Sequence, residues 1–216
     1  MAKKVPRNEA RQALLECTLT HLAAKGPANV QPKDVCAELG LSKALVNYHF
    51  GGRDALITEA MVLGYERYVE TLWEAAESAG ADPLDRLMAW VDAQVEWTSA
   101  NAGLAAALNF PFFASGLPVD LDGSAVERLT AAGARNFSNL QQLVSVAKDA
   151  VSKKKRRGRP DAVEVGLDSA IIGWMTLGLS VWKAGNHLPT QGLNSGTALT
   201  VARNHMRAEI RAMIER

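Results

Sequence analysis

QPKDVCAELGLSKALVNYHFGGRDALITEAM, residues 31–61, has the spacing of two short helices joined by a tight turn and followed by a third helix. Pro32 suits the first position of a helix, because its missing amide hydrogen would have no partner there. Gly40 can take the left-handed conformation that ends a helix, and Ser42 can accept a hydrogen bond from the free amides of the next turn. The stretch therefore predicts a helix-turn-helix whose second helix begins at Lys43 and runs to about Phe50.

The second helix of this motif has an apolar side and a polar side. Leu45, Val46 and Phe50 are the apolar positions, so the polar residues are left to point outward or to the helix edges. An exposed helix of this kind fits the major groove of DNA, where lysine donates to guanine acceptors and asparagine pairs with adenine. We therefore expect Lys43 and Asn47, one turn apart, to contact base edges.

The remaining DNA contacts are expected around this helix. Tyr48, His49 and Arg53 end in hydrogen-bond donors and are expected to meet phosphate oxygens, whereas Lys33 can reach bases or phosphates. The complete predicted DNA-binding set is Gln31, Lys33, Ser42, Lys43, Ala44, Asn47, Tyr48, His49 and Arg53. The alternative is an amphipathic helix pair of the kind common in all-helical proteins, in which Tyr48 and His49 merely cover the core.

Three short motifs in this stretch carry a family resemblance. They are the Gly-Leu-Ser turn at residues 40–42, Tyr-His-Phe at residues 48–50, and Arg-Asp-Ala-Leu at residues 53–56. On these motifs, residues 11–65 resemble the N-terminal domain of TetR-family (tetracycline-repressor-like) transcriptional regulators. The resemblance implies a homodimeric repressor or activator with three DNA-binding helices and a larger helical ligand domain. The family often has Tyr where this chain has Asn47, and Lys where it has Arg53, so an operator cannot be transferred from it.

Composition and charge agree with a DNA-binding globular protein. Hydrophobic residues make up 48% of the 216-residue chain, no apolar run reaches the roughly 20 residues that span a bilayer, and the N-terminus lacks the apolar core of a secretion signal. We expect a cytoplasmic protein that does not associate with membranes. Residues 1–53 carry a net charge of +4, residues 54–151 of −9 and residues 152–216 of +6. The electrostatic field of this charge distribution is expected to orient the basic residues 1–53 toward DNA phosphates. The basic tract SKKKRRGRP, residues 152–160, predicts a solvated loop, with added phosphate affinity as its alternative.

Helical periodicity and turn residues continue along the rest of the chain, without strand alternation. The expected helices span about residues 9–25, 32–39, 43–50, 54–78, 83–101, 104–115, 124–153, 161–184 and 196–215. We therefore predict an all-α fold of about nine helices. Residues 1–53 form its helix-turn-helix domain, which a long helix joins to a helical ligand-binding and dimerisation domain over residues 54–216.

A small-molecule site and a dimer interface are expected in the second domain. Aromatic and amide side chains suit an apolar pocket with a few hydrogen-bonding groups, although they suit an ordinary core equally well. The predicted ligand-binding residues are Trp97, Asn101, Phe110, Phe113, Phe137 and Trp174, for a small apolar or aromatic effector. Gly166, Gly173 and Gly178 favour close approach of another helix, and in the resembling family the last two helices form the dimer. The predicted interface is Ile172, Met175, Leu179, Trp182, Leu199, Met206 and Ile210, with packing inside the monomer as the alternative.

Catalytic and metal motifs are not found in the sequence. There is no phosphate-binding Gly-rich loop, no His-Glu-x-x-His and no Gly-x-Ser-x-Gly, so we expect no catalytic residue, no metal and no cofactor. Cys17 and Cys36 lie in apolar helical contexts and are expected to be buried thiols without a His at ligand spacing. The sequence thus favours a ligand-responsive repressor that binds a palindromic operator as a dimer. The competing function is a helical small-molecule-binding or interaction protein without DNA-binding activity.

Overall fold

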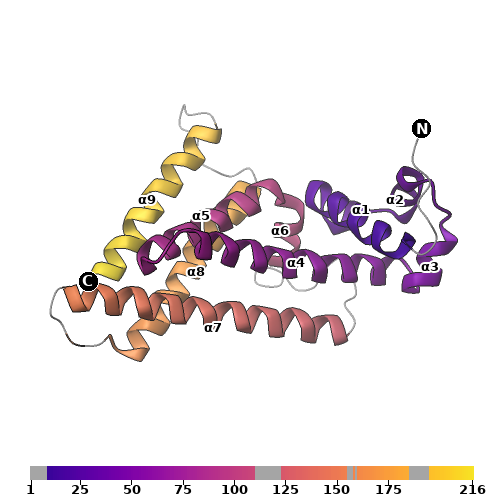
Figure 1. Cartoon of the computed structure of the whole chain (residues 1–216). Helices are drawn as coiled ribbons and strands as arrows, with labels where there is room; N and C mark the ends of the chain where they lie inside the picture. Colours follow the sequence, from indigo (N-terminus) through magenta and orange to yellow (C-terminus); the bar gives the residue numbers. More distant parts are fainter. Residues whose placement is uncertain (1–8, 110–122, 155–157, 159, 185–194) are drawn as a thin grey trace. The chain divides into compact units, whose positions relative to one another are not determined.

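The computed structural model describes residues 9–109, 123–154, 158, 160–184 and 195–216, and every regular element in those ranges is helical (Figure 1). The elements are α1 (Ala10–Lys25), the short 3-10 helix η1 (Pro27–Asn29), α2 (Pro32–Leu39), α3 (Ala44–Phe50), α4 (Arg53–Ser78), α5 (Pro83–Ala100), α6 (Ala102–Asn109), α7 (Gly123–Lys154), α8 (Ala162–Ala184) and α9 (Ser195–Glu215). The predicted all-α class is confirmed, and outside α6 the expected helix bounds differ from these by only a residue or two. The second half of the helix expected over residues 104–115 lies outside the described residues.

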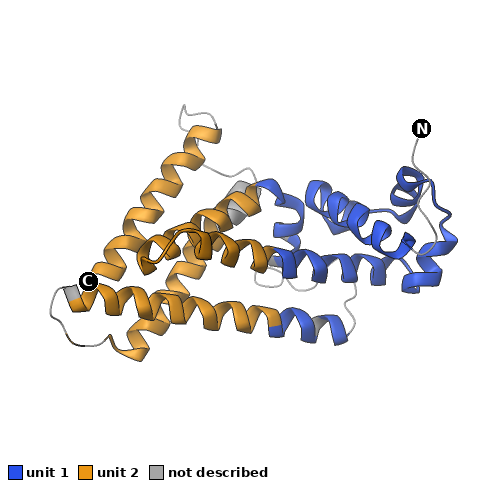
Figure 2. Cartoon of the chain, in the orientation of Figure 1, with its two compact units in different colours: residues 1–67, 100–131 blue, residues 68–99, 132–216 orange. Residues whose placement is uncertain are grey.

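The helices fall into two compact units (Figure 2). Unit 1 comprises residues 1–67 and 100–131, and unit 2 comprises residues 68–99 and 132–216. Helices α4 and α7 each contribute residues to both units. Unit 1 thus takes in residues beyond 53, and the domain boundary expected there stays a prediction.

Unit 1 is organised around α1, which packs against α2, α3, η1 and α6. The contact between α1 and α6 is made by backbone at Gly103. A Cβ atom at that position would lie 2.6 Å from the backbone nitrogen of Gly26 and closer still to the carbonyl oxygen of Leu22. Because the obstructing atoms belong to the backbone, a larger residue could not be accommodated by a side-chain rotation.

Left-handed glycines end the two helices of the helix-turn-helix. Gly40 closes α2 with a φ of 63°, and the amide of Leu41 donates to the carbonyl oxygen of Cys36 at 2.8 Å. Gly51 closes α3 with a φ of 82°. These ends satisfy carbonyl groups that the last turn of a helix leaves free, as the sequence predicts for Gly40. Helix α3 begins at Ala44, one residue later than expected, and has no side-chain cap.

Unit 2 has its own hydrophobic core, built from α5, α8, α9 and the parts of α4 and α7 that belong to this unit. The fully buried side chains of this core include Leu72, Leu87, Val91, Val144, Ile172, Ile210 and Ile214. Helix α8 packs directly against α9. The apolar sides of these helices therefore cover one another within the chain.

A buried ion-pair cluster lies between α7 and α8. Lys148 is 4% exposed, and its ammonium group donates to Asp168 at 2.5 Å and to Glu164 at 2.7 Å. Burial lowers the pKa of Lys148, but the hydrogen bonds and charges of the two carboxylates outweigh that effect and hold it above its ordinary value. The Lys148 ammonium therefore stays charged at neutral pH.

The same helix, α8, contains the one stretch in the described part of the chain that is long and apolar enough to cross a membrane, Ala162–Leu179. Length and composition are weak evidence of a span, because core helices pass the same test. The stretch includes Asp168, whose ion pair with Lys148 ties it to α7.

Replacement of Lys148 by Met tests the buried cluster. The change leaves the Asp168 carboxylate buried without a cation, so we expect the free energy of unfolding to fall by about 3–5 kcal/mol in urea denaturation at pH 7. Since the pKa of Lys148 is raised on folding, its stabilisation is complete below the unfolded pKa and is lost only as the pH rises through the folded value. The loss in Lys148→Met should therefore be as large at pH 8 as at pH 7.

The matched control is Lys153→Met on the same helix, where an exposed ammonium pairs with Asp149. That change should alter stability by less than about 1 kcal/mol. Equal effects of the two substitutions would contradict the assignment.

Candidate nucleic-acid interface

Helix α3 has one buried side and one side open to solvent. Val46 is 1% exposed and anchors the buried side. Lys43, Ala44 and Asn47 are exposed, and Tyr48 is 75% exposed. Within unit 1 the helix therefore presents amine, methyl, amide and phenol groups to solvent, which are the groups that contact base edges and phosphates in a DNA groove.

The C-terminal end of α3 is held by aromatic contacts. The rings of Tyr48 and His49 meet edge to face with their centroids 4.9 Å apart. His49 is half-buried, and its Nε2 atom is buried without a partner among the described residues. The guanidinium of Arg11, on α1, lies 5.2 Å from the centroid of the Phe50 ring and 3.6 Å from the Glu59 carboxylate. These contacts fix where α3 ends relative to α1.

Arg53, at the start of α4, bonds to the protein itself. Its Nε donates to the carbonyl oxygen of Val30 at 3.0 Å, and its Nη2 donates to that of Pro27 at 2.7 Å. Its Nη1 donates to Asp54 at 2.7 Å. The side chain thus ties the segment between α1 and α2 to the start of α4. The phosphate contact expected of Arg53 stays a prediction, and the structure shows a positioning role that the sequence did not reveal.

All nine residues predicted to contact DNA lie in unit 1. Seven of them are exposed, namely Gln31, Lys33, Ser42, Lys43, Ala44, Asn47 and Tyr48. His49 and Arg53 are half-buried. The exposed members lie on α2, on α3 and on the residues that precede each helix, and their DNA contacts stay predictions.

The predicted ligand-binding residues belong to both units or lie outside the described residues, so the ligand site stays a prediction. The Trp97 ring packs on Tyr68 with centroids 4.6 Å apart, while Phe137 and Trp174 are 41% and 57% exposed. Asn101 belongs to unit 1, where its carbonyl oxygen accepts from the amide of Ala105. Phe110 and Phe113 lie outside the described residues.

The predicted dimer residues lie mostly inside unit 2. Ile172, Leu179, Met206 and Ile210 are buried in its core, and Met175 and Leu199 are half-buried against that core. Trp182 belongs to α8, but its side chain lies outside the described residues. The described members thus pack within unit 2, and the dimer interface expected at these positions stays a prediction.

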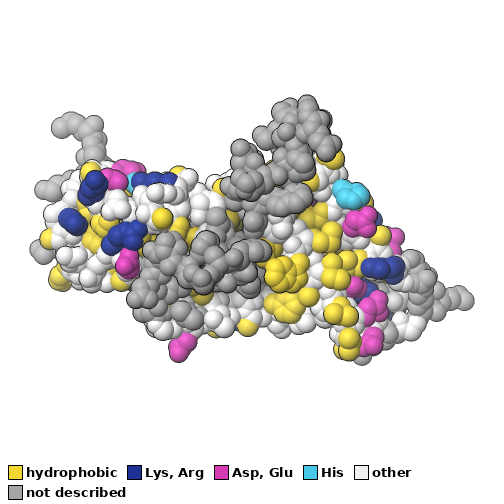
Figure 3. Space-filling model, turned by 180° about the vertical axis from the view of Figure 1, so that it is seen from behind, with side chains coloured by type: hydrophobic (Ala, Val, Ile, Leu, Met, Phe, Trp, Pro, Cys, Tyr) yellow, Lys and Arg dark blue, Asp and Glu magenta, His cyan; other side chains and the backbone are white. Residues whose placement is uncertain are grey.

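Other apolar side chains of α8 face solvent. They recur every three or four residues and are Val163, Leu167, Ile171 and Trp174, at 68%, 60%, 44% and 57% exposure. We call these four residues the α8 ridge. A Cβ atom built at Gly173 or Gly178 would meet no described atom within 4 Å, so neither glycine serves a close approach within the described chain. Figure 3 shows hydrophobic side chains gathered on one face of unit 2.

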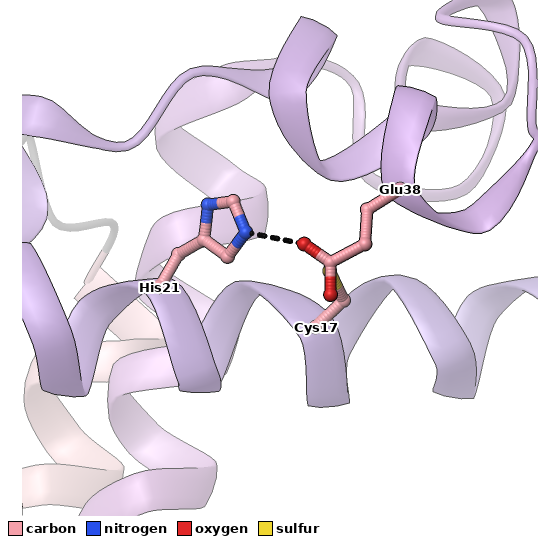
Figure 4. Close-up of side chains that lie close together, drawn as sticks. All are labelled: Cys17, His21 and Glu38. Atoms are coloured by element: carbon pink, nitrogen blue, oxygen red, sulfur yellow. Dashed lines mark hydrogen bonds and ion pairs between the residues drawn. The ribbon is translucent and has the colours of Figure 1, made fainter.

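A cluster of potential metal ligands lies between α1 and α2 (Figure 4). Cys17 and His21 lie one turn apart on α1, and Glu38 reaches them from the last turn of α2. The Nε2 atom of His21 lies 2.9 Å from Oε2 of Glu38, and one donor atom from each of the three residues lies within 4.8 Å of the others. Burial, with a smaller contribution from the Glu38 charge, raises the pKa of the Cys17 thiol to about 11. The hydrogen bond from His21 lowers the pKa of Glu38.

The expectation that neither cysteine has a His at ligand spacing was wrong for Cys17. Its four-residue separation from His21 places both on one side of a helix, and this signal is visible in the sequence. The third member, Glu38, is brought to the pair only by the packing of α2 on α1.

Known proteins share both the motif and the fold. Residues 14–60 match the family of bacterial regulatory proteins called the tetR family. The HTH-type transcriptional regulator BetI of Stenotrophomonas maltophilia (strain R551-3) is 29% identical over 101 residues, which are 47% of this chain and 52% of BetI. The chain thus matches about half the length of this relative.

Solved structures extend the similarity to the whole fold. A putative TetR-family transcriptional regulator from Rhodococcus sp. superposes with a TM-score of 0.60 at 20% identity, over 96% of this chain and 99% of that one. AibR, solved in complex with isovaleryl coenzyme A and operator DNA, superposes with a TM-score of 0.63 at 14% identity, over 92% and 96% of the two chains. The resemblance to TetR-family regulators that the sequence predicts is confirmed.

Substitution of Arg53 by Ala tests its positioning role. The change removes hydrogen bonds from a charged donor to the carbonyl oxygens of Pro27 and Val30, each of which is worth about 1.5–3 kcal/mol. Because water can replace part of these bonds at a half-buried side chain, we expect the free energy of unfolding to fall by about 2–3 kcal/mol in all, in thermal or urea denaturation without DNA. Lys33→Ala, at an exposed position on α2, is the control and should leave stability nearly unchanged. If Arg53→Ala were as stable as the control, its role would be confined to DNA contact.

Proposed function

We propose that this chain, which has the DNA-binding domain and the fold of the TetR family, is a ligand-responsive, sequence-specific transcriptional repressor. It binds a palindromic operator as a homodimer and is released by a small apolar or aromatic effector. The observation that carries the proposal is the solvent-facing side of α3, where Lys43 and Asn47 are exposed while Val46 is buried. Such a regulator acts where the DNA is, in the cytoplasm.

The chemistry of the exposed side of α3 supports base reading. Lysine donates to the O6 and N7 acceptors of guanine, and asparagine pairs bidentately with adenine. The Ala44 methyl group suits apolar contact with a thymine methyl. Tyr48 and Lys33 add donors for phosphates on either side of the groove. Together these residues can read a short half-site, and the salt-dependent phosphate contacts set the register.

The competing function, a helical ligand carrier or interaction protein without DNA binding, requires a helix-turn-helix whose polar side is used internally. In the structure Lys43 is exposed and makes none of the described ion pairs, and His49 is only half-buried. The exposed amine and amide have no evident role in a carrier. The exposure of Lys43 and the partial exposure of His49 therefore favour the DNA-binding regulator over the carrier.

A gel-shift experiment tests the readout by α3. We expect the full chain to bind the DNA upstream of its own coding region at low salt and without effector. Lys43→Ala and Asn47→Ala should each lower the preference for that site over unrelated DNA by about 1–3 kcal/mol, roughly five- to 150-fold. Lys153→Ala, an exposed lysine in unit 2, should leave the preference unchanged. The absence of binding by the unaltered chain to any neighbouring promoter would favour the carrier.

The homodimer is proposed on the α8 ridge. Large apolar side chains that recur on one side of a helix and face solvent are typical of an interface. In a two-fold dimer the ridge packs against the same ridge of a second copy, so one surface of the chain forms both sides of the interface. Two recognition helices can then read half-sites one turn of DNA apart, about 34 Å. The proposed interface thus uses exposed residues of α8, in place of the residues of α8 and α9 expected from the sequence.

Introduction of a charge on the ridge tests the dimer. Leu167→Glu places a carboxylate where we propose the two copies meet, so sedimentation should show a monomer in place of a dimer, with weaker operator binding. The control is Val146→Glu on α7, which alters another exposed hydrophobic residue, 48% exposed, outside the ridge. A dimer that survives Leu167→Glu but not Val146→Glu would place the interface elsewhere.

The effector response is proposed to act through α4. This helix begins at Arg53, beside the helix-turn-helix, and continues into unit 2 as far as Ser78. An effector that binds better to the conformation with one position of α4 than to the conformation with another shifts the population toward the first conformation. The shift in DNA affinity can be no larger than the difference in the effector's binding free energy between the two conformations. AibR, solved in complex with isovaleryl coenzyme A and operator DNA, provides a precedent for a small molecule and operator DNA bound by one protein of this fold.

A further inference from the structure

The cluster of Cys17, His21 and Glu38 has no role in the proposed reading of DNA. We propose that these three residues bind one divalent cation of the zinc class, with water as the remaining ligand. The site lies wholly within unit 1, between α1 and the last turn of α2 (Figure 4).

The donor set selects the class of metal. Thiolate and imidazole ligands favour Zn²⁺ and Co²⁺, whereas Mg²⁺ and Ca²⁺ prefer all-oxygen sites. Zinc sites use sulfur, nitrogen and carboxylate oxygen together, and three protein ligands with one water is a known arrangement. The chemistry of Cys17, His21 and Glu38 therefore fits zinc better than the hard cations.

The spacing of the donor atoms fits a single ion after a small closure. Metal–ligand bonds of about 2.0–2.3 Å in a tetrahedron place ligand atoms roughly 3.3–3.8 Å apart. The three donors lie within 4.8 Å of one another, and Nε2 of His21 and Oε2 of Glu38, at 2.9 Å, must move slightly apart as the longer separations close. Glu38 can supply the closure, because its side chain is 60% exposed and free to change rotamer, whereas Cys17 is held at 8% exposure. The exposed Glu38 side also provides an entry path for the ion.

The helix ends favour a cation at this place. Glu38 lies in the last turn of α2, where no basic residue is present and where the helix dipole disfavours a negative charge. A bound cation would offset both the dipole and the carboxylate charge. Nδ1 of His21 is buried without a partner among the described residues, so an imidazole that binds a metal through Nε2 carries its proton on Nδ1 without a described acceptor, and the metal bond has to outweigh that cost.

Binding of the ion has a defined proton balance and a structural consequence. The Cys17 thiol releases its proton to solvent, and the imidazole proton that faces Glu38 moves to Nδ1. The ion then joins α1 to the end of α2, directly before the turn at Gly40 that leads into α3. Occupancy would therefore stabilise the helix-turn-helix in the arrangement that presents α3.

Cobalt titration of the full, reduced chain tests the site without any need for DNA. We expect one Co²⁺ per chain and a near-ultraviolet thiolate-to-cobalt absorption band that Zn²⁺ displaces and Mg²⁺ does not. The band should vanish in Cys17→Ser and persist in Cys36→Ser, which alters the other buried cysteine. Glu38→Gln, at an exposed position that should not affect folding, should weaken Co²⁺ binding at least about tenfold.

Thermal denaturation provides an independent reading of the same site. Zinc should raise the unfolding temperature of the unaltered chain and of Cys36→Ser, and should raise that of Glu38→Gln much less. The absence of a cobalt band in the unaltered chain would overturn the site, as would a band lost in Cys36→Ser but retained in Cys17→Ser. Because neither measurement involves an operator, loss of the metal site and loss of DNA binding would be seen separately.

Discussion

The exposed surface of α3 depends on the burial of its opposite side. The helix has seven residues, too few to be stable alone in water, so its geometry comes from packing. Val46 is the buried anchor, and the Arg11 guanidinium over the Phe50 ring holds the far end against α1. The position of the groups that face solvent is therefore set by α1 and by the segment that Arg53 ties to α4.

Local signals in the sequence were enough for the helices and for the turn between α2 and α3. Gly40 predicted the end of α2 because glycine readily takes the left-handed conformation of a helix end, and the structure gives it a φ of 63°. Pro32 predicted the start of α2 because the first residue of a helix has no use for an amide hydrogen, which proline lacks. The exposed side of α3 followed from the apolar spacing of Leu45, Val46 and Phe50. The apolar periodicity of residues 43–50 therefore predicted both the helix and which of its sides faces solvent.

The inward side of α8 and the place of Glu38 beside Cys17 and His21 could not be predicted in this way. Helix α8 has apolar residues on several sides, so its pattern could not tell Ile172, which is buried, from Ile171, which is 44% exposed. Glu38 is seventeen residues from His21, and only the packing of α2 on α1 brings their side chains together. In the same way, the carbonyl partners of Arg53 lie more than twenty residues before it. Contacts of this range depend on tertiary structure, which one sequence does not reveal.

Unit 1 is discontinuous in the sequence, because residues 100–131 return to it after the chain has contributed to unit 2. During synthesis, α1 therefore leaves the ribosome well before α6, whose Gly103 fits against the backbone at the end of α1. The end of α1 is therefore covered only after α6 has been made. A fragment cut after residue 67 would keep every residue of the helix-turn-helix and still leave the end of α1 uncovered.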